Sequence, residues 1–553
     1  MNNLKPVITF NYFYESQYNL EDSLKLLWPY GLNDLIEFLI WFKNSLNSKS
    51  ELKILEHFKK RLPNWKAKNF ERILKEGFDF TNELALARFL IELIKKYPND
   101  SITPKRSMDE SDFDDIVFDL ILIFNSEQYE INKDQIDNNS NESIWAIALT
   151  QSFTGLNEID FVRTVLPKYL ILISFIKNFL KSKFKILENE ILEKTTAENL
   201  YTLGISLMQL FSNTNTKVSS FQFIEKNEIY EFFKRMDMII DFENLPNPNF
   251  NLNDYINKPF YKNSSGDFIL LNRSDFAFAL EKRFPHFLLE ETSLRLLVKN
   301  IDKTYRDSFF SKLFFEKYLM GTIFKDLEKP GFRVLEGEDS ILTDHTIIYN
   351  EKNIFLLECK TTTVHYNDIY YQNIEGFKST LDKNFCSEKK GVSQLVKTIE
   401  RILLNADDTY KLKTDFSKIT IYPIIIYSDS KLIMHGVNDY LNSQFEEFCK
   451  EKRFPFKEIK PLVMINYSFF LENHKLIKTN RRILKESIDH YLKFLRNKKS
   501  VFYKKNDSYD YFSSMTPFET YVVGYKKLYM LNQSEILKEM IGVFNLKEET
   551  KAA

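Results

Sequence analysis

The sequence has almost no cysteine and no excess of charge of either sign. Its 553 residues include only Cys359, Cys386 and Cys449, which excludes a disulfide framework and a cysteine zinc site. We therefore expect a protein of the reducing cytoplasm. Lysine and arginine total 76 against 77 acidic residues, a formal net charge of −1. A surface that binds nucleic acid must then be a local basic patch, offset by acidic residues elsewhere.

Long apolar runs and targeting signals are also missing. The most apolar stretch, YLILISFI at 169–176, is eight residues between two lysines, whereas a membrane helix needs about 20. We expect it to be a buried helix segment and expect no membrane partner. The opening MNNLKPVITFNYFYES lacks the charged-then-apolar order of a signal peptide. Nothing reads G-x-x-x-x-G-K-S/T, so no phosphate-binding loop is expected and any energy source would come from a partner.

The sequence does contain a helical first half. With 44% hydrophobic and 28% charged residues, it is typical of a globular chain, and its length predicts roughly two to four domains. Apolar residues recur at helical spacing in the stretches 22–46, 82–97, 113–124, 161–192 and 197–211. Polar stretches at 98–111 and 125–143 separate some of these helices. Because 242–255 is rich in proline and asparagine, we place a boundary there and predict an all-helical region at 1–250 for recognition, regulation or assembly.

After this boundary, strands alternate with helices. Residues 258–272 predict two short strands around an Asn-Ser-Ser-Gly turn. Further strands are expected at 334–337, 343–350, 353–362, 418–429 and 460–470. Helices are expected at 274–284, 295–327, 391–406 and 437–452, and the proline at 330 stops the second. The order predicts an α/β core at 251–475, with helices covering a central sheet, and a helical basic extension at 476–553.

One stretch of this core, TDHTIIYNEKNIFLLECKTTT at 343–363, places charges at the end of an apolar strand. Strand side chains alternate, so Glu358 and Lys360 project to one face. Residues 350–353 form a plausible hairpin turn, and pairing of the two strands would bring Asp344 beside Glu358. Two buried carboxylates repel each other, and a divalent cation such as Mg²⁺ removes that repulsion. Lys360 would then help to position or deprotonate the attacking water, or stabilise charge on phosphate.

This arrangement resembles the active site of the PD-(D/E)xK nuclease superfamily, which has the restriction-endonuclease-like fold. Asp344 matches the aspartate that opens the second core strand, and Glu358-Cys359-Lys360 matches E-x-K. Thr343 stands where many members have proline. Phe315-Glu316-Lys317-Tyr318 is similar to the family phrase F-E-x-Y, and Gln394 matches a glutamine on the helix after E-x-K. The resemblance covers roughly residues 300–475 and does not extend to 1–250.

The resemblance implies a central mixed sheet and hydrolysis of phosphodiester bonds, with DNA favoured over RNA. It implies Mg²⁺ as cofactor, with Mn²⁺ as a substitute, held by Asp344, Glu358, Glu316 and the backbone carbonyl of Cys359. Lys360 and Gln394 complete the implied catalytic set. By analogy with other stand-alone nucleases, we expect a role in bacterial restriction or anti-phage defence. The helical half would bind a second copy of the chain or a partner protein.

Several alternatives remain open at the level of single residues. An acidic residue two positions before a lysine also occurs at 51–53, 388–390 and 458–460. It occurs again in Asp429-Ser430-Lys431, where Asp415 precedes Asp429 by fourteen positions, the same spacing as between Asp344 and Glu358. Asp429 follows its strand instead of lying inside it, so we reject that motif. Glu358 and Lys360 can be a structural ion pair, and Glu316 and Gln394 ordinary polar residues of amphipathic helices. Glu336 or Glu338 would be the substitute acidic ligand.

Other residues carry further signals. His345 is expected to be a packing residue and Cys359 a core residue. Tyr366, Tyr370 and Tyr371 would either stack on bases or pack against the core. The basic stretches 478–482 and 496–506 would contact phosphates or form a solvated helix face. At the level of function, the alternatives are an inactive nucleic-acid-binding or assembly protein with the same fold and an RNA-directed toxin nuclease.

Overall fold

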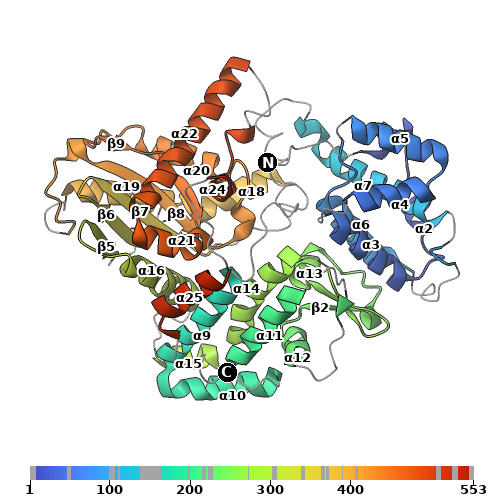
Figure 1. The fold of residues 1–553 in the computed structure, drawn as a ribbon, viewed down its shortest axis with the longest axis horizontal. Helices are drawn as coiled ribbons and strands as arrows, with labels where there is room; N and C mark the ends of the chain where they lie inside the picture. The colour runs from blue at the N-terminus through green and yellow to red at the C-terminus, as the bar shows by residue number, and fades with distance from the viewer. Residues whose placement is uncertain are drawn as a thin grey trace.

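The structure is a computed structural model, and its helical elements outnumber its strands (Figure 1). It describes residues 8–46, 51–76, 78–98, 106–109, 112–136, 164–195, 200–213, 220–221, 228–271, 273–301, 308–337, 343–362, 368, 373–388, 390–404, 409–505, 512–525 and 533–546. Within these residues, the chain forms helices around two mixed sheets, which is an α plus α/β architecture. No helix among them is both long and apolar enough to cross a membrane.

The N-terminal helices form a separate lobe of the ribbon, at the right of Figure 1. They are α1 (Phe10–Tyr14), α2 (Leu20–Lys25), α3 (Leu32–Leu46), α4 (Glu51–Arg61), α5 (Asn64–Lys75), α6 (Glu83–Lys96) and α7 (Phe113–Ile136). The expected helix at 22–46 is broken between α2 and α3, where Pro29 and Gly31 interrupt the chain. The expected polar separator at 125–143 is also wrong in part, because α7 continues to Ile136.

A second group of helices follows in the chain. It comprises α9 (Leu166–Leu180), η3 (Lys181–Lys183), α10 (Phe184–Thr195), α11 (Leu200–Asn213), α12 (Glu228–Arg235), α13 (Leu252–Asn257), α14 (Arg273–Glu290) and α15 (Leu294–Ile301). The apolar stretch 169–176 lies in α9 and is buried throughout, as expected. The expected helix at 161–192 is divided at Lys181, whose φ of 52° lies outside the helical region.

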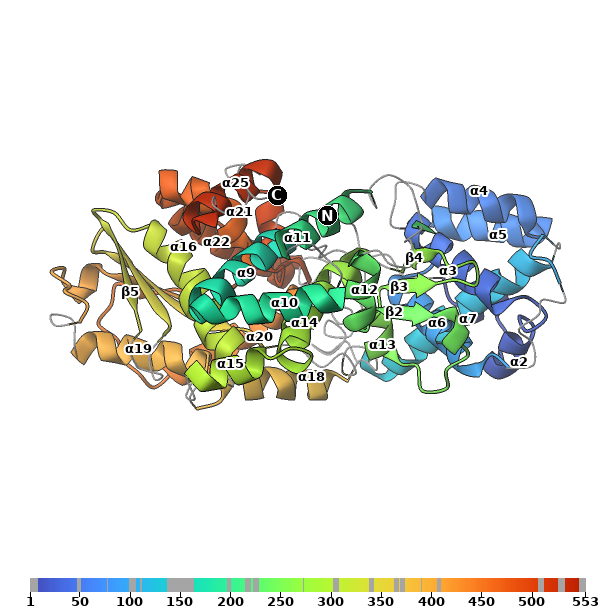
Figure 2. The same ribbon diagram turned by 90° about the horizontal axis from the view of Figure 1, so that it is seen from below.

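A small four-stranded sheet contradicts the prediction that residues 1–250 are all-helical. Its strands are β1 (Ser220–Phe221), β2 (Ile239–Asp241), β3 (Phe260–Lys262) and β4 (Phe268–Leu270), in the order β1-β4-β3-β2. The hairpin predicted at 258–272 is confirmed, since β3 and β4 pair antiparallel around the turn. β2 pairs parallel with β3, across the segment 242–255. Figure 2 shows this sheet beside α3, where Tyr261 donates a 2.9 Å hydrogen bond to Asn33.

The larger sheet has the strand order β10-β8-β7-β6-β5, with β9 also paired to β8. Its strands are β5 (Phe332–Glu336), β6 (His345–Tyr349), β7 (Asn353–Lys360), β8 (Thr420–Tyr427), β9 (Glu458–Ile459) and β10 (Val463–Asn466). β5, β6 and β7 are antiparallel neighbours, whereas β7, β8 and β10 run parallel. The expected strand 460–470 is too long, because the Asn466 side chain accepts from the Ser468 amide and begins a helix there.

Helices cover both faces of this sheet. They are η6 (Phe309–Met320), α16 (Gly321–Asp326), α18 (Ile374–Leu381), η7 (Asp382–Cys386), α19 (Val392–Leu404), α20 (Val437–Cys449) and α21 (Tyr467–Thr479). Three short 3₁₀ turns also occur in the described residues: η4 (Phe242–Asn244), η8 (Phe416–Lys418) and η9 (Ser430–Leu432). The expected helix 295–327 is described as α15, η6 and α16, which ends at Asp326, before Pro330.

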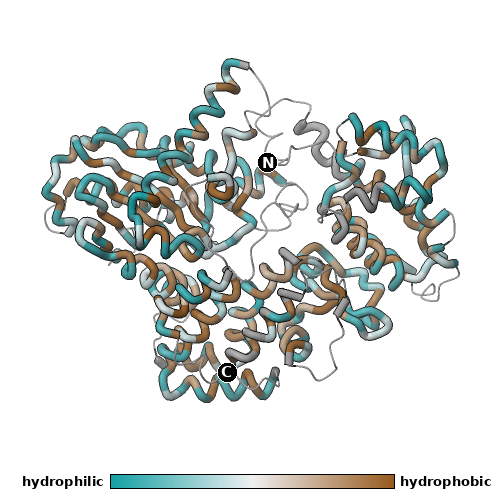
Figure 3. Tube along the Cα trace, in the orientation of Figure 1, coloured by the Kyte–Doolittle hydropathy of each residue, from teal (hydrophilic) through white to brown (hydrophobic). Residues whose placement is uncertain are grey.

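The alternation of β7 divides the apolar core. Ile354 and Leu356 pack into the cluster that includes α19 and α20. Phe355 and Leu357 pack into the cluster that includes η6, α16 and α21. Figure 3 shows the strands of this sheet as largely hydrophobic. The sheet is therefore buried on both faces. A charged side chain at the end of β7 is costly to bury there unless it is paired.

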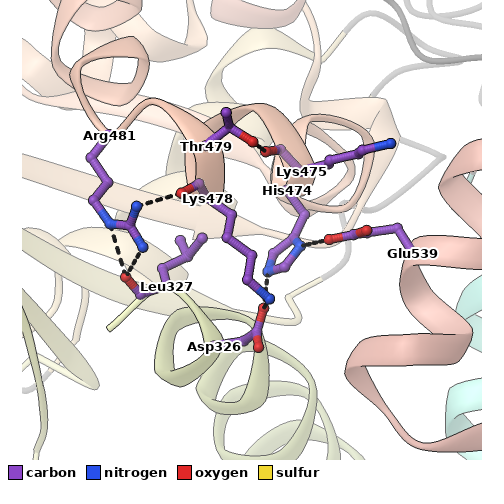
Figure 4. Close-up of polar contacts among 8 residues, drawn as sticks. All are labelled: Asp326, Leu327, His474, Lys475, Lys478, Thr479, Arg481 and Glu539. Carbon is purple, nitrogen blue, oxygen red and sulfur yellow. Dashed lines mark hydrogen bonds and ion pairs between the residues drawn. The ribbon is translucent and has the colours of Figure 1, made fainter. Parts of the chain in front are cut away.

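The C-terminal helices α22 (Arg482–Lys505), α24 (Phe518–Val523) and α25 (Gln533–Val543) pack back onto the core. Figure 4 shows the contacts that fasten this region, with His474 of α21 between Asp326 and Glu539. Lys478 pairs with Asp326 at 2.6 Å, and Arg481 donates to the carbonyl of Leu327 at 3.0 Å. These two members of the basic stretch 478–482 therefore hold α21 to the end of α16.

Candidate functional site

Asp344 lies at the beginning of β6, opposite the end of β7. The register pairs His345 with Leu357, so the next position along the hairpin brings Asp344 level with Glu358. The Cys359 amide donates a 2.7 Å hydrogen bond to Asp344 Oδ2. The Asp344 carbonyl accepts a second bond from the Gly337 amide at 2.8 Å. Backbone amides thus fix both the side-chain carboxylate and the backbone carbonyl of Asp344, and the carboxylate points to the end of β7.

Glu358 and Lys360 form a buried ion pair at this end of β7. Glu358 is 0% exposed, and its Oε1 contacts Lys360 Nζ. Its other oxygen, Oε2, is buried without a hydrogen-bond partner among the described residues. Burial raises the pKa of Glu358 well above its usual range, and the charge of Asp344 adds to the effect. Burial alone would lower the pKa of Lys360, but Glu358 and Asp344 outweigh burial and raise it.

Glu316 reaches the same carboxylates from η6, on the other side of the hairpin. Burial raises the pKa of Glu316 to about 8, and Asp344 adds to this through its charge and a hydrogen bond between the two carboxyl groups. The backbone carbonyl of Glu316 accepts a bond from the Gly321 amide, five residues on, which is the π-helical pattern. The three acidic side chains therefore come from three different elements, η6, the start of β6 and β7.

His345 positions the helix that carries Glu316. Its Nε2 lies 3.0 Å from the Glu316 carbonyl oxygen, and a carbonyl only accepts, so Nε2 carries the proton and donates. The side chain is 2% exposed, and burial lowers its pKa. A neutral His345 therefore joins η6 to β6 directly beside Asp344. The sequence predicted only a packing role for it, and its position next to Asp344 was the one available signal.

Gln394 approaches Lys360 from α19. Its Oε1 accepts from Lys360 Nζ at 3.1 Å and from the Gly391 amide at 2.9 Å. Gly391 has a φ of +46°, and a Cβ there would lie 2.4 Å from the Phe385 carbonyl oxygen, so the turn before α19 requires glycine. Because two donors hold the Gln394 oxygen, it fixes the direction of the Lys360 ammonium group.

Thr398 is a contributor that the sequence analysis missed. It is fully buried one turn after Gln394. Its hydroxyl donates to the Gln394 carbonyl at 2.8 Å and accepts from the Thr343 amide at 3.0 Å. The same side chain thus links α19 to the residue before Asp344. The signal that could have found it is its spacing of four residues from Gln394, which places both on one helix face.

The structure thus brings five predicted residues together: Glu316, Asp344, Glu358, Lys360 and Gln394. The Cys359 side chain faces the opposite side of β7 and is buried in the core. The other candidates lie elsewhere. Glu336 is exposed on β5 opposite His345, and Asp429 caps the turn η9. Glu338, Tyr366, Tyr370 and Tyr371 lie outside the described residues.

The donor set fits a hard divalent cation in its chemistry. Glu316, Asp344 and Glu358 supply carboxylate oxygens, which Mg²⁺ prefers, and the unpartnered Glu358 Oε2 is an orphaned buried acceptor. As the side chains lie, no three metal-ligating groups of the described residues converge on one ion position. Glu358 Oε1 is turned toward Lys360 instead.

Comparison with family models, with curated proteins and with solved structures found no match to this chain.

Proposed function

We propose that this chain is a metal-dependent nuclease with a restriction-endonuclease-like core. The observation that carries the proposal is the ion pair of Glu358 and Lys360 at the end of a buried strand, with Asp344 beside it and Glu358 Oε2 unpartnered. A buried carboxylate oxygen without a partner is costly to the fold. The position of this oxygen beside two further carboxylates favours a binding role for Glu358 over a purely structural one.

In this proposal Asp344, Glu358, Glu316 and the Cys359 backbone carbonyl would hold Mg²⁺ or Mn²⁺. When bound, the cation supplies Lewis-acid polarisation of phosphoryl oxygens and neutralises charge on the phosphate. The Cys359 amide would hold the Asp344 carboxylate in place as a ligand. Because burial raises the pKa of Glu316 to about 8, Glu316 would have to lose its proton to act as a ligand.

Lys360 acts on the phosphate in this proposal, and Gln394 acts through Lys360. Lys360 is a cation in the buried site, so it stabilises the negative charge that accumulates on the phosphoryl oxygens. Gln394 holds its ammonium group in place. Hydrolysis adds the water oxygen to phosphorus and breaks the bond to the 3′ oxygen, which takes up a proton. The products are a 5′ phosphate and a 3′ hydroxyl.

The direct test is cleavage of plasmid, linear duplex, single-stranded DNA and RNA with Mg²⁺ or Mn²⁺. We expect wild type to cleave and Asp344→Ala and Lys360→Ala to be inactive. Lys460→Ala is a matched control, since Lys460 belongs to the chance motif at 458–460 and pairs with Glu458 at 2.7 Å away from the site. Equal behaviour of wild type and both site variants would rule out the nuclease function.

DNA as substrate and a role in bacterial restriction or anti-phage defence are further parts of the proposal, supported by the family resemblance. Cleavage of RNA alone would favour the toxin nuclease instead. Binding without cleavage, and without stabilisation by metal, would favour the inactive binding or assembly protein.

A further inference from the structure

A cavity of about 370 Å³ is lined in part by residues that adjoin site residues in the chain. Its walls are α9, α14, η6 and the residues that follow β7 and β8. Phe315 in its lining precedes Glu316, and Thr361 follows Lys360. The Ser428 amide, also at the lining, donates a 3.0 Å bond to the Lys360 carbonyl. The cavity therefore begins one residue away from two of the proposed site residues.

Seven of the nineteen lining residues are aromatic. They are Tyr169 of α9, Phe278 and Phe284 of α14, and Phe309, Phe310, Phe314 and Phe315 of η6. Its volume lies within the roughly 300–1,000 Å³ of small-ligand sites, whose walls are largely apolar and aromatic. Rings in the wall favour a flat aromatic occupant, because aromatic rings stack or meet edge to face.

The charges around the cavity are balanced, which argues against a phosphate-rich occupant. Lys168 is paired with Glu281, and the Tyr467 hydroxyl donates to that same carboxylate at 2.9 Å. The other charged members of the lining are Lys282 and Asp429, one of each sign. An occupant with several phosphates would meet as many carboxylates as ammonium groups. A neutral ring with hydrogen-bonding edges fits better.

Some polar groups of the lining follow the ends of β7 and β8. Asp429 is 4% exposed, and Ser428 and Thr361 accompany it at the ends of β8 and β7. A carboxylate and hydroxyl groups pair with the donors and acceptors on a base edge. A ring bound in the cavity would have these groups as hydrogen-bond partners, and Thr361 and Ser428 adjoin Lys360.

We propose that this cavity receives one unstacked nucleobase of the substrate strand, next to the phosphate that the site would cleave. The proposal rests on the nuclease function proposed above. Enzymes that act on nucleic acids can extrude a base into a pocket lined by aromatic side chains, and each stacked base adds affinity. Phe315 and Thr361 of the lining adjoin Glu316 and Lys360 in the chain, and this short separation favours a base of the strand itself over a free nucleoside.

The test uses the full chain carrying Lys360→Ala, which would bind without cleaving. Oligonucleotides with 5-iodouracil at successive positions are bound, irradiated and mapped by mass spectrometry. We expect cross-links in 278–289 or 309–315 from one position of the strand. Phe310→Ala, at a half-buried ring of the lining, should weaken binding by roughly 10-fold or more, and Phe310→Tyr should restore it.

Leu313→Ala is the matched control, because Leu313 is half-buried on the same helix η6 but does not line the cavity. Cross-links only elsewhere, or equal affinity of the Phe310→Ala and Leu313→Ala proteins, would overturn the base pocket while wild-type cleavage left the nuclease function intact. Tighter binding of free nucleosides than of oligonucleotides would also overturn it, in favour of a small effector. If wild type neither bound nor cleaved nucleic acid, the proposed function itself would fail, and the base pocket with it.

Discussion

The Cys359 amide donates a 2.7 Å hydrogen bond to Asp344 Oδ2. This bond joins the strand that carries Glu358 and Lys360 to the start of its hairpin partner. It orients the Asp344 carboxylate by a backbone group, which every substitution at residue 359 except proline would keep. Geometry and charge at the site can therefore be separated experimentally.

Asp344→Asn separates them, because the amide oxygen of asparagine can still accept from Cys359 while the charge is lost. We expect unchanged folding and a fall in cleavage rate of roughly 100-fold or more. Thermal stability should stay the same or rise, since the carboxyl groups of Glu316 and Glu358 lose a repelling neighbour. Cleavage kinetics and thermal denaturation check both points. Asp415→Asn, in the exposed turn before β8, is the control. Full activity of Asp344→Asn would contradict the proposed ligand role.

Divalent cations should stabilise wild type. A ligand that binds only the folded state at 100 times its Kd adds about 2.7 kcal/mol to the free energy of unfolding. We expect Mg²⁺ or Mn²⁺ to raise the melting temperature of wild type, and Glu358→Gln to abolish the shift because it removes one of the proposed carboxylate ligands. Differential scanning calorimetry with and without the cation measures the change in melting temperature. No shift in wild type would instead agree with a protein that binds without catalysis.

Gln394→Ala should weaken catalysis through Lys360 without removing the ammonium group. The Gln394 oxygen fixes that group at 3.1 Å, and loss of such a supporting contact costs roughly 10- to 100-fold. We expect kcat to fall while KM changes little, because substrate contacts are kept. Lys397→Ala on the exposed side of the same helix is the control. A large rise in KM with unchanged kcat would assign Gln394 to binding.

Glu519 should make stability depend on pH. Burial raises its pKa from 4.5 to about 7, and its carboxylate accepts from the Asn466 amide at the end of β10. The folded state holds this proton more tightly, so the contribution to stability is complete below pH 4.5 and is lost as pH rises through 7. The loss is roughly 1.4 kcal/mol for each unit of pKa shift. Urea denaturation of wild type and Glu519→Gln from pH 5 to 8 should show profiles that diverge. Parallel profiles would contradict the buried charge.

His474 should anchor the C-terminal helix α25. It is 0% exposed and lies 2.9 Å from Glu539 and 3.2 Å from Asp326 (Figure 4). His474→Leu leaves the Glu539 carboxylate without this partner, which should lower the free energy of unfolding by about 1–3 kcal/mol. Chemical denaturation measures the change, with His286→Leu on the exposed side of α14 as control. Equal losses in both variants would show that the anchor contributes nothing specific.

Local patterns predicted the parts of the core that depend on neighbours in the chain. The hairpin of β6 and β7 follows from two apolar runs around 350–353, where Asn350 and Glu351 adopt positive φ. Alternation along β7 placed Glu358 and Lys360 on one face, and the motif named Asp344. Helical spacing also located most helices, but their ends were less certain: strand 460–470 failed because a cap at Asn466 outweighed the β-branched pattern.

The sequence by itself thus determined the hairpin, its charges and the apolar faces of the helices, because all of these depend on residues close in the chain. Only the tertiary structure decided that Glu316 lies at Asp344 and that Gln394 lies at Lys360, although they are 42 residues before and 36 after Glu358. Helical periodicity says which face of η6 or α19 is buried, and not which strand end that face meets. The pairing of β2 with β3 and the aromatic cavity were decided in the same way, since each joins segments that only long-range packing brings together.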